Sequence, residues 1–238
     1  MPPLAKALDF GAGSLRETYA LAADGFAVTA VDMCLDTMQS YYKDYDWTSA
    51  REPQLVANPA ISLVGFVAAE KKFDLICAFD VLEHLDRPEE LCEEMRDCLD
   101  TKGVLFCSVP NRLSLVEILT RARWKIGLAR GRVFAPGEPH VQFRSPNEWR
   151  RFFNRSGFEV VDHEMAMGVL FVTWTALAAL PARWLDVFMQ RRLGWRPRAE
   201  RAVTTPTLMS KINAIDGLLP RFFERFSGSN LFVLRAAA

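Results

Sequence analysis

The stretch LDFGAGS, residues 8–14, places two glycines on either side of Ala12, directly after a short apolar run. Glycine lets the backbone turn tightly and approach a ligand closely, so a G-x-G loop is a candidate for binding a nucleotide or nucleoside. The third glycine of the dinucleotide pattern G-x-G-x-x-G is missing, because Leu15 and Arg16 stand where it would fall. The loop alone therefore does not identify its ligand, and the surrounding sequence has to decide.

The segments on both sides of the loop predict a strand–loop–helix–strand unit. Residues 5–10 form an apolar strand, and FAVTAVD at 26–32 forms a second, β-branched strand that ends on Asp32. Asp32 stands 19 residues after Gly13, where an acidic residue can accept hydrogen bonds from the hydroxyls of a ribose. Free N–H groups at the start of the intervening helix would complete a site for a nucleoside cofactor.

Capping residues predict two helix starts in this region. Ser14 and Glu17 form a capping box directly after the glycine loop. Further along, Asn58–Pro59 is typical of an N-cap followed by the first helical position, which favours QLVA at 54–57 as the third strand. The alternative third strand is ISLV at 61–64.

Strands and helices continue to alternate along most of the chain, which predicts a mainly parallel sheet covered on both faces. The further elements that we expect are a helix from Asp36, a strand at 73–80, a helix at 88–99, a strand at 104–110, a helix at 145–156 and strands at 158–165 and 229–235.

Composition and charge exclude several classes of function. The 29 basic and 29 acidic residues give a net charge of +0, which argues against a general affinity for nucleic acid or anionic membranes. The five cysteines form no C-x-x-C pair, so we expect buried free thiols and no bound metal. The start of the chain lacks the long apolar core of a signal peptide, and the apolar run at 165–180 is shorter than the ~20 residues of a transmembrane helix. We therefore expect a cytoplasmic protein without a transmembrane segment.

Three parts of the sequence resemble the class I S-adenosylmethionine-dependent methyltransferases. Residues 9–13 match the motif D-x-G-x-G, and Asp32 matches the acidic residue that binds the ribose. Residues 73–111, with V-L-E-H at 81–84, are similar to the fourth strand, following helix and fifth strand of the ubiquinone-biosynthesis O-methyltransferase-like subgroup. Residues 140–161 are similar to the segment that follows in the same subgroup.

This resemblance implies a Rossmann-like α/β fold with a seven-stranded, mainly parallel sheet in the order 3-2-1-4-5-7-6, the last strand antiparallel, and helices on both faces. It also implies S-adenosyl-L-methionine as the cofactor. The adenine amino group is usually bound by an acidic residue in this family, but that position would be Asn58 or, in the other register, Phe66. The cofactor-binding residues that we expect are Asp9, Gly11, Ala12, Gly13, Asp32, Met33, Asn58, Phe79, Asp80 and Val81.

Two histidines are candidate catalytic residues. Methyl transfer needs a base only if the acceptor is a hydroxyl or ammonium group that loses a proton. His140 follows the variable connection at 112–140, which by the resemblance lines the acceptor pocket, and we expect it to act as the base. His84 follows the fourth strand and is the second candidate, with a structural role at the start of a helix as the alternative.

We expect two parts in the chain and an enzymatic function. Residues 1–165 plus 227–238 would form the methyltransferase domain, and 166–226 an apolar helical extension that acts as a substrate lid or as an interface, either in a dimer or at a membrane surface. The expected reaction is methyl transfer to a small-molecule, lipid-linked or sugar-linked acceptor of amphiphilic character, at an oxygen. The alternatives are an NAD(P)-dependent oxidoreductase and a non-catalytic methyltransferase-fold partner subunit.

Overall fold

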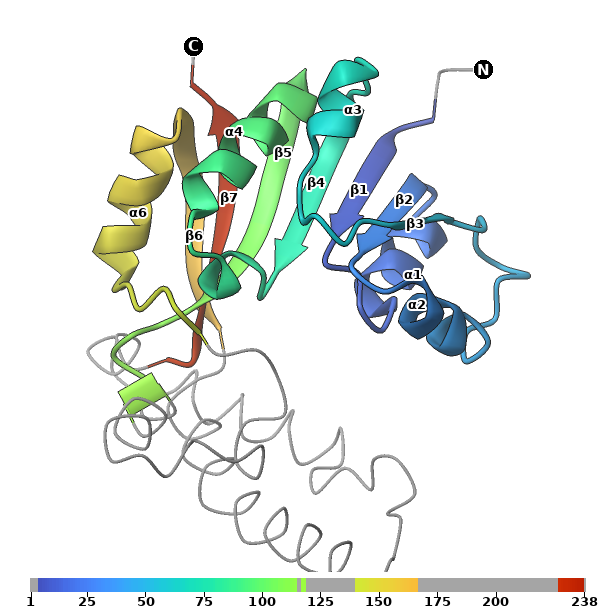
Figure 1. Cartoon of the computed structure of the whole chain (residues 1–238), viewed down its shortest axis with the longest axis horizontal. Helices are drawn as coiled ribbons and strands as arrows, with labels where there is room; N and C mark the ends of the chain where they lie inside the picture. Colours follow the sequence, from blue (N-terminus) through green and yellow to red (C-terminus); the bar gives the residue numbers. More distant parts are fainter. Residues whose placement is uncertain (1–3, 115–116, 119–139, 167–226, 238) are drawn as a thin grey trace, which may run out of the picture. The chain divides into compact units, whose positions relative to one another are not determined.

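The computed structural model describes residues 4–114, 117–118, 140–166 and 227–237. Its central element is a seven-stranded sheet (Figure 1). The strands follow the order β3-β2-β1-β4-β5-β7-β6, which confirms the predicted topology. Their bounds are β1 (Lys6–Phe10), β2 (Ala27–Asp32), β3 (Gln54–Ala57), β4 (Phe73–Phe79), β5 (Leu99–Pro110), β6 (Phe158–Ala166) and β7 (Ser229–Ala236).

The strand directions bring the predicted cofactor residues to one edge of the sheet. β1 pairs in parallel with both β2 and β4, β2 pairs in parallel with β3, and β4 pairs in parallel with β5. The last strand is antiparallel, as expected. The carboxyl ends of parallel strands meet at the same edge, so the loops after β1, β2 and β4 are neighbours.

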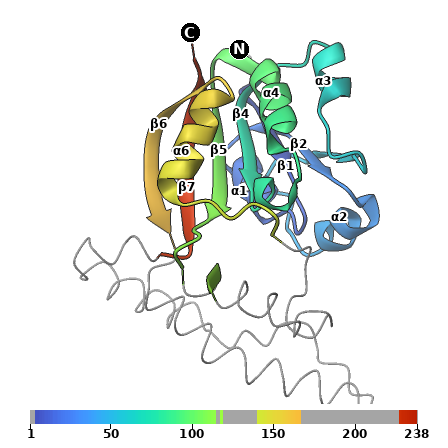
Figure 2. The same ribbon diagram turned by 60° about the vertical axis from the view of Figure 1, so that its left-hand side comes forward.

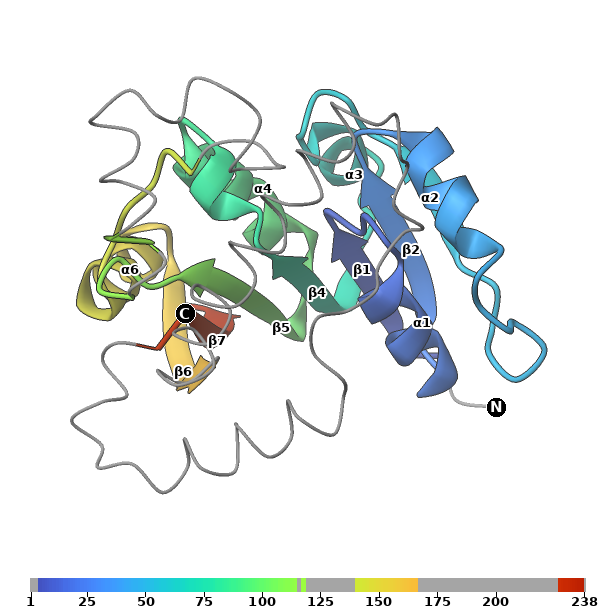
Figure 3. The same cartoon turned by 90° about the horizontal axis from the view of Figure 1, so that it is seen from below.

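Helices cover the sheet on both faces because alternate residues of each strand point to opposite sides. On one face, Leu8 and Ile76 belong to a buried cluster with residues of α3, α4 and α6. On the other, Ala7 and Ala30 lie in clusters that include residues of α1 and α2. Figures 2 and 3 show α4 and α1 on opposite sides of the sheet. The helix bounds are α1 (Arg16–Ala23), α2 (Leu35–Tyr42), α3 (Val64–Ala68), the 3₁₀ helix η1 (Leu82–His84), α4 (Pro88–Cys98) and α6 (Pro146–Arg155).

Two predicted helix starts were wrong. α1 begins at Arg16, its N-cap is Leu15 in a left-handed conformation with φ 61°, and no side chain caps it. Glu17 accepts hydrogen bonds from Arg16 and so does not form the predicted capping box. β3 occupies residues 54–57 as favoured, but Asn58 and Pro59 lie in a turn and the next helix starts only at Val64.

Contacts between Cα atoms divide the chain into two compact units. The first comprises Met1–Val109, Pro146–Glu164 and Leu231–Ala238, and the second comprises Pro110–Ser145 and Met165–Asn230. Most of the predicted helical extension, residues 167–226, lies outside the described residues, so its expected role stays a prediction. Within the described part of the chain, no helix has both the length and the hydropathy needed to cross a membrane.

Gly11 and Gly25 offer a matched test of the turn that follows β1. Both have a left-handed φ, 79° and 94°, but a Cβ on Gly11 would lie 2.5 Å from Cγ2 of Val81, whereas a Cβ on Gly25 would have no described atom within 4 Å. We expect Gly25→Ala to lower the free energy of unfolding by about 1–2 kcal/mol, the cost of the left-handed conformation. Gly11→Ala should cost a further 1–3 kcal/mol, roughly the cost of overpacking.

Urea denaturation followed by circular dichroism measures both losses. Val81→Ala in the Gly11→Ala background should recover most of the additional loss, because it removes the atom that the new methyl group meets. Equal losses for the two alanine variants would contradict this explanation of Gly11.

Candidate cofactor-binding site

The loop after β1 is held against the end of β2 by backbone hydrogen bonds. The N–H groups of Gly11 and Ala12 both donate to the carbonyl oxygen of Val31, at 2.8 and 3.0 Å. Gly13 also has a positive φ, 41°, and the one described atom within 4 Å of a Cβ built on it would be the Gly11 carbonyl oxygen, at 3.8 Å. The loop is therefore tightly turned at Gly11 and has space beside Gly13 for a ligand.

Asp32 joins the loops that follow β1 and β2. Its Oδ2 accepts a hydrogen bond from Gly13 N–H at 2.9 Å, and its Oδ1 accepts one from Cys34 N–H at 3.2 Å. A carboxylate has about four acceptor positions, so two remain for the hydroxyl groups of a ribose. The structure thus places this predicted residue beside the glycine loop, in an orientation fixed by two backbone donors.

Asp9 has a different environment from the other predicted cofactor residues. Its side chain is only 2% exposed, and its Oδ2 accepts a hydrogen bond from the Thr18 hydroxyl at 2.5 Å. Burial raises the pKa of Asp9 to about 6, although the bond from Thr18 acts in the opposite direction. The carboxyl group therefore connects β1 to α1 beneath the loop.

Asn58 follows β3 directly and lies next to Asp32. Its backbone N–H donates to the carbonyl oxygen of Asp32 at 2.7 Å, and its side-chain Nδ2 donates to the carbonyl oxygen of Ser62. With its amide nitrogen so engaged, Asn58 has its Oδ1 to offer as an acceptor. Phe66, the residue of the other register, is partly buried and packs against the core, with its ring centroid 6.2 Å from that of Phe73.

Glu94 of α4 fixes the loop that contains Asn58. Its carboxylate accepts hydrogen bonds from the Ser62 hydroxyl at 2.9 and 3.0 Å and from Leu63 N–H. Glu94 was not among the residues predicted for the site. No local pattern shows this contact, because 32 residues separate Glu94 from Ser62.

The end of β4 is a strained turn that contacts the glycine loop. Asp80 has a left-handed φ of 53°, which is uncommon for a residue other than glycine. Ser108 stabilises it, since its Oγ accepts from Asp80 N–H at 3.0 Å and donates to Asp80 Oδ1 at 2.8 Å. Phe79 packs edge-to-face on Phe106 at 5.1 Å, and Val81 approaches Gly11.

Met33 and Cys34 are exposed beside Asp32, which corrects the expectation of five buried thiols. Met33 is 46% exposed, and Cys34 is the exposed cysteine of the five. A hydrogen bond from the Thr37 side chain lowers the pKa of Cys34, whereas burial raises that of Cys77 to about 12. The surface beside Asp32 therefore carries one apolar side chain and one accessible sulfur.

The two candidate catalytic histidines each have a buried carboxylate nearby, at different distances. His84 ends η1, and its Nε2 lies 3.9 Å from Oε1 of Glu83, which is longer than a hydrogen bond. His140 belongs to the second unit, where its Nδ1 lies 2.9 Å from Oε1 of Glu117. Glu117 was not among the predicted site residues. Its spacing from Ser114, in the pattern S-x-x-E, is that of a capping box and could have indicated it.

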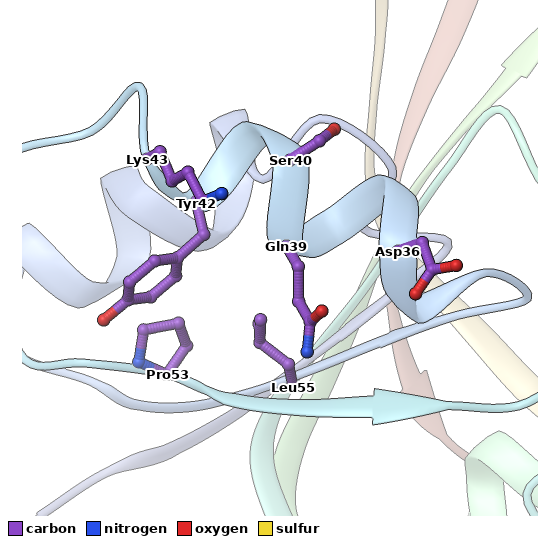
Figure 4. Close-up of a pocket in the computed structure, with 7 residues that line it drawn as sticks. All are labelled: Asp36, Gln39, Ser40, Tyr42, Lys43, Pro53 and Leu55. Carbon is purple, nitrogen blue, oxygen red and sulfur yellow. The ribbon is translucent and has the colours of Figure 1, made fainter.

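A groove of about 550 Å³ lies between α2 and β3 (Figure 4). Its lining residues are Asp36, Gln39, Ser40, Tyr42, Lys43, Pro53 and Leu55. Four of them are polar or charged and exposed: Asp36, Gln39 and Ser40 on α2, and Lys43 directly after it. None of the predicted cofactor residues lines this groove, so it is separate from the candidate site.

Comparisons with known proteins agree with the fold. The family described as "Methyltransferase domain" matches residues 2–163. A ubiquinone biosynthesis O-methyltransferase from Glaesserella parasuis serovar 5 (strain SH0165) is 26% identical over 158 residues, which cover 65% of this chain and 65% of that protein. The corresponding enzyme of Histophilus somni (strain 2336) is 31% identical over 113 residues, 45% of each chain. The matched region thus spans about half to two thirds of the length of these relatives.

A solved structure supports the same architecture. A SAM-dependent methyltransferase from Thiobacillus denitrificans, in complex with S-adenosyl-L-homocysteine, superposes with a TM-score of 0.56 and 19% sequence identity. The superposition covers 98% of this chain and 85% of that one. At this identity the likeness establishes the fold.

Asp9 predicts a specific pH dependence of stability. Its pKa is about 6 in the folded chain against an ordinary value of 3.8, so between these pH values the folded state binds more protons than the unfolded state. The free energy of unfolding should therefore fall as the pH rises from about 4 to 6, and this one group should account for about 3 kcal/mol. In Asp9→Asn, whose amide oxygen can still accept the bond from Thr18, that decline should be absent.

Urea denaturation at several pH values between 4 and 7 measures this difference. Asp36→Asn, a change at an exposed carboxylate, serves as the control and should keep the slope of the parent. Parallel stability curves for the parent and Asp9→Asn would show that Asp9 does not titrate in this range.

Proposed function

This chain belongs to the methyltransferase domain family, and we propose that it is a class I S-adenosylmethionine-dependent methyltransferase that acts on an oxygen of a small, amphiphilic acceptor. The observation that carries the proposal is the position of Asp32. Its carboxylate ends β2, is oriented by Gly13 and Cys34 and keeps acceptor capacity for a ribose diol. Curated relatives that are 26 and 31% identical bear the name of O-methyltransferases, which supports oxygen as the acceptor atom.

The residues around the glycine loop fit the chemical groups of this cofactor. Asp32 can accept hydrogen bonds from the ribose, and Oδ1 of Asn58 can accept one from the adenine amino group. The exposed thioether of Met33 offers an apolar surface for the adenine ring. Ala12 and Gly13 would supply the close backbone approach that the loop permits.

A negatively charged residue near the glycine loop favours a cofactor that carries positive charge over a dinucleotide. Asp80 directly follows β4 and is exposed, and its carboxylate would attract a cationic group and repel a pyrophosphate. S-adenosylmethionine carries a positive sulfonium and an ammonium group instead. Leu15 and Arg16 replace the third glycine that makes room for a pyrophosphate, which further disfavours an NAD(P)-dependent oxidoreductase.

We assign His140 as the base of the reaction. S-adenosylmethionine supplies a methyl group on a positively charged sulfur, which activates it for displacement. The oxygen of the acceptor hydroxyl would form the new bond to the methyl carbon while the carbon–sulfur bond breaks and its electron pair returns to sulfur. His140 would take the hydroxyl proton.

The proposal also includes the chemical character of the acceptor and the location of the protein in the cell. Residues 166–226 contain many large apolar side chains at helical spacing, which favours an apolar acceptor pocket, with a dimer interface or a membrane-surface contact as alternatives. A cytoplasmic location is a further prediction. A role as a non-catalytic methyltransferase-fold partner subunit is the alternative to enzymatic activity. Cofactor binding and turnover together separate these alternatives.

Asp32→Ala should weaken binding of S-adenosylhomocysteine by roughly 1.5–3 kcal/mol, the scale of hydrogen bonds to a charged group. Isothermal titration calorimetry on the full chain measures the change. Asp36→Ala removes a nearby exposed carboxylate and should bind like the parent. Unchanged affinity in Asp32→Ala would remove Asp32 from the site, and preferential binding of NAD by the parent would refute the proposed cofactor.

His140→Ala should lower turnover by about 10²–10⁴-fold, the usual contribution of a general base, while its affinity for S-adenosylhomocysteine stays unchanged. Transfer of a labelled methyl group to catechol, a phenolic probe acceptor, provides the assay. His84→Ala is the comparison variant and should lose less activity. The opposite ranking of the two variants would assign the base to His84.

A further inference from the structure

The loop between β3 and α3 is tied to α4 by one carboxylate, that of Glu94. The hydroxyl of Ser62 donates to its Oε1 and Oε2 at 2.9 and 3.0 Å, and Leu63 N–H donates to its Oε2. We propose that Glu94 is a positioning residue for the cofactor, because through Ser62 it orients the side chain of Asn58 for recognition of the adenine amino group. This inference rests on the proposed function, since it concerns the base of the same cofactor.

Ser62 connects Glu94 to Asn58. Its carbonyl oxygen accepts a hydrogen bond from Nδ2 of Asn58. A carbonyl oxygen can only accept, so the amide of Asn58 has to turn its nitrogen, and not Oδ1, toward Ser62. Oδ1 then faces away from Ser62 as an acceptor. An acceptor suits the amino group of adenine and opposes the C6 oxygen of hypoxanthine, which is itself an acceptor.

The backbone of Asn58 is fixed separately, next to the residue that we assign to the ribose. Its N–H donates to the carbonyl oxygen of Asp32 at 2.7 Å, and its own carbonyl oxygen accepts from Ile61 N–H at 3.1 Å. These bonds set the position of Asn58 but leave its side chain free to rotate. Among the described residues, Ser62 is the one hydrogen-bond partner of the Asn58 amide, so the rotation depends on where Ser62 is held.

The loop needs support because it contains a strained residue. Ile61 has a left-handed φ of 50°, which is an outlier for a β-branched side chain. Ile61 packs against the core, and Leu63 is fully buried. Glu94 adds bonds to Ser62 and Leu63, directly after the strained position. A strained residue persists only where its surroundings determine it several times over, so loss of the carboxylate should let this part of the loop relax and release the amide of Asn58.

Glu94 differs from the residue before it on the same helix. Glu93 is exposed, whereas Glu94 is half-buried. A carboxylate that is partly withdrawn from water requires donors, and the hydroxyl of Ser62 and the N–H of Leu63 supply them. Hydrogen bonds to a charged group are shorter and stronger than those between neutral groups. Glu94 is therefore suited to hold the loop, and Glu93 provides a matched control.

Discrimination between two bases tests this role on the full chain. Isothermal titration calorimetry compares S-adenosylhomocysteine with S-inosylhomocysteine, in which an oxygen replaces the amino group of the base. We expect the parent to bind the adenosine compound about tenfold more tightly, the equivalent of one hydrogen bond. Asn58→Ala removes the acceptor and should abolish this preference. Glu94→Ala should remove most of it, because the amide of Asn58 can then rotate.

The ratio of the two affinities distinguishes positioning from a general structural role. Loss of stability alone would weaken binding of both compounds equally and leave their ratio unchanged. Glu94→Gln keeps an acceptor oxygen for the loop and should restore much of the preference, and Glu93→Ala should match the parent. In an Asn58→Ala background, Glu94→Ala should change the ratio no further, because its effect acts through Asn58.

The outcomes separate this inference from the proposed function. A preference that Glu94→Ala leaves intact would overturn the role of Glu94 while the cofactor assignment stands, and so would a further change of the ratio in the Asn58→Ala background. If Glu94→Ala does not fold, Ser62→Ala decides, since it removes the hydroxyl that Glu94 binds. A smaller preference in that variant supports the inference, and an unchanged one overturns it. A parent that binds neither compound overturns the proposed function and this inference together.

Discussion

The turn at Gly11 is the constraint on which the rest of the candidate cofactor site depends. Its N–H binds Val31 at the end of β2, and its lack of a side chain admits Val81 from the end of β4. The loop can then reach Asp32 through Gly13 N–H. Three strand ends are thus joined at one residue, and a side chain there would separate them. Everything that we assign to the cofactor follows from this close approach.

The sheet and the positions of Gly11 and Asp32 could be predicted from the sequence because they depend on local patterns. Apolar segments of four to eight residues, separated by amphipathic helices, determine a parallel sheet almost independently of detailed packing. Asp32 was identified by its place at the end of such a segment. The same reasoning located β3 and the end of β4, since each lies at a change from apolar to polar residues.

The features that could not be predicted depend on competition between effects or on partners distant in sequence. Ser14 has the correct residue type and spacing for an N-cap, yet Leu15 occupies the cap position and its side chain is fully buried. Burying a leucine is worth about 1.5–3 kcal/mol, which exceeds the ~1 kcal/mol of a typical N-cap and offsets the left-handed conformation. Glu94 and Glu117 were missed for a different reason. Their partners lie more than 20 residues away in the sequence, where no local pattern can identify them.

The residues assigned to cofactor binding and the residue assigned as the base lie in different units of the chain. The residues assigned to the cofactor all belong to the first unit, and Glu117 with His140 belongs to the second. Asp32 accepts bonds from its own loops, whereas Glu117, whose N–H donates to Ser114 Oγ, lies 2.9 Å from Nδ1 of His140. These two sets of bonds share no residue, so any effect of a substitution in one set on the other would be a coupling energy between them. A substitution at His140 that changes cofactor affinity would therefore reveal a coupling that the bonds described within each set do not provide.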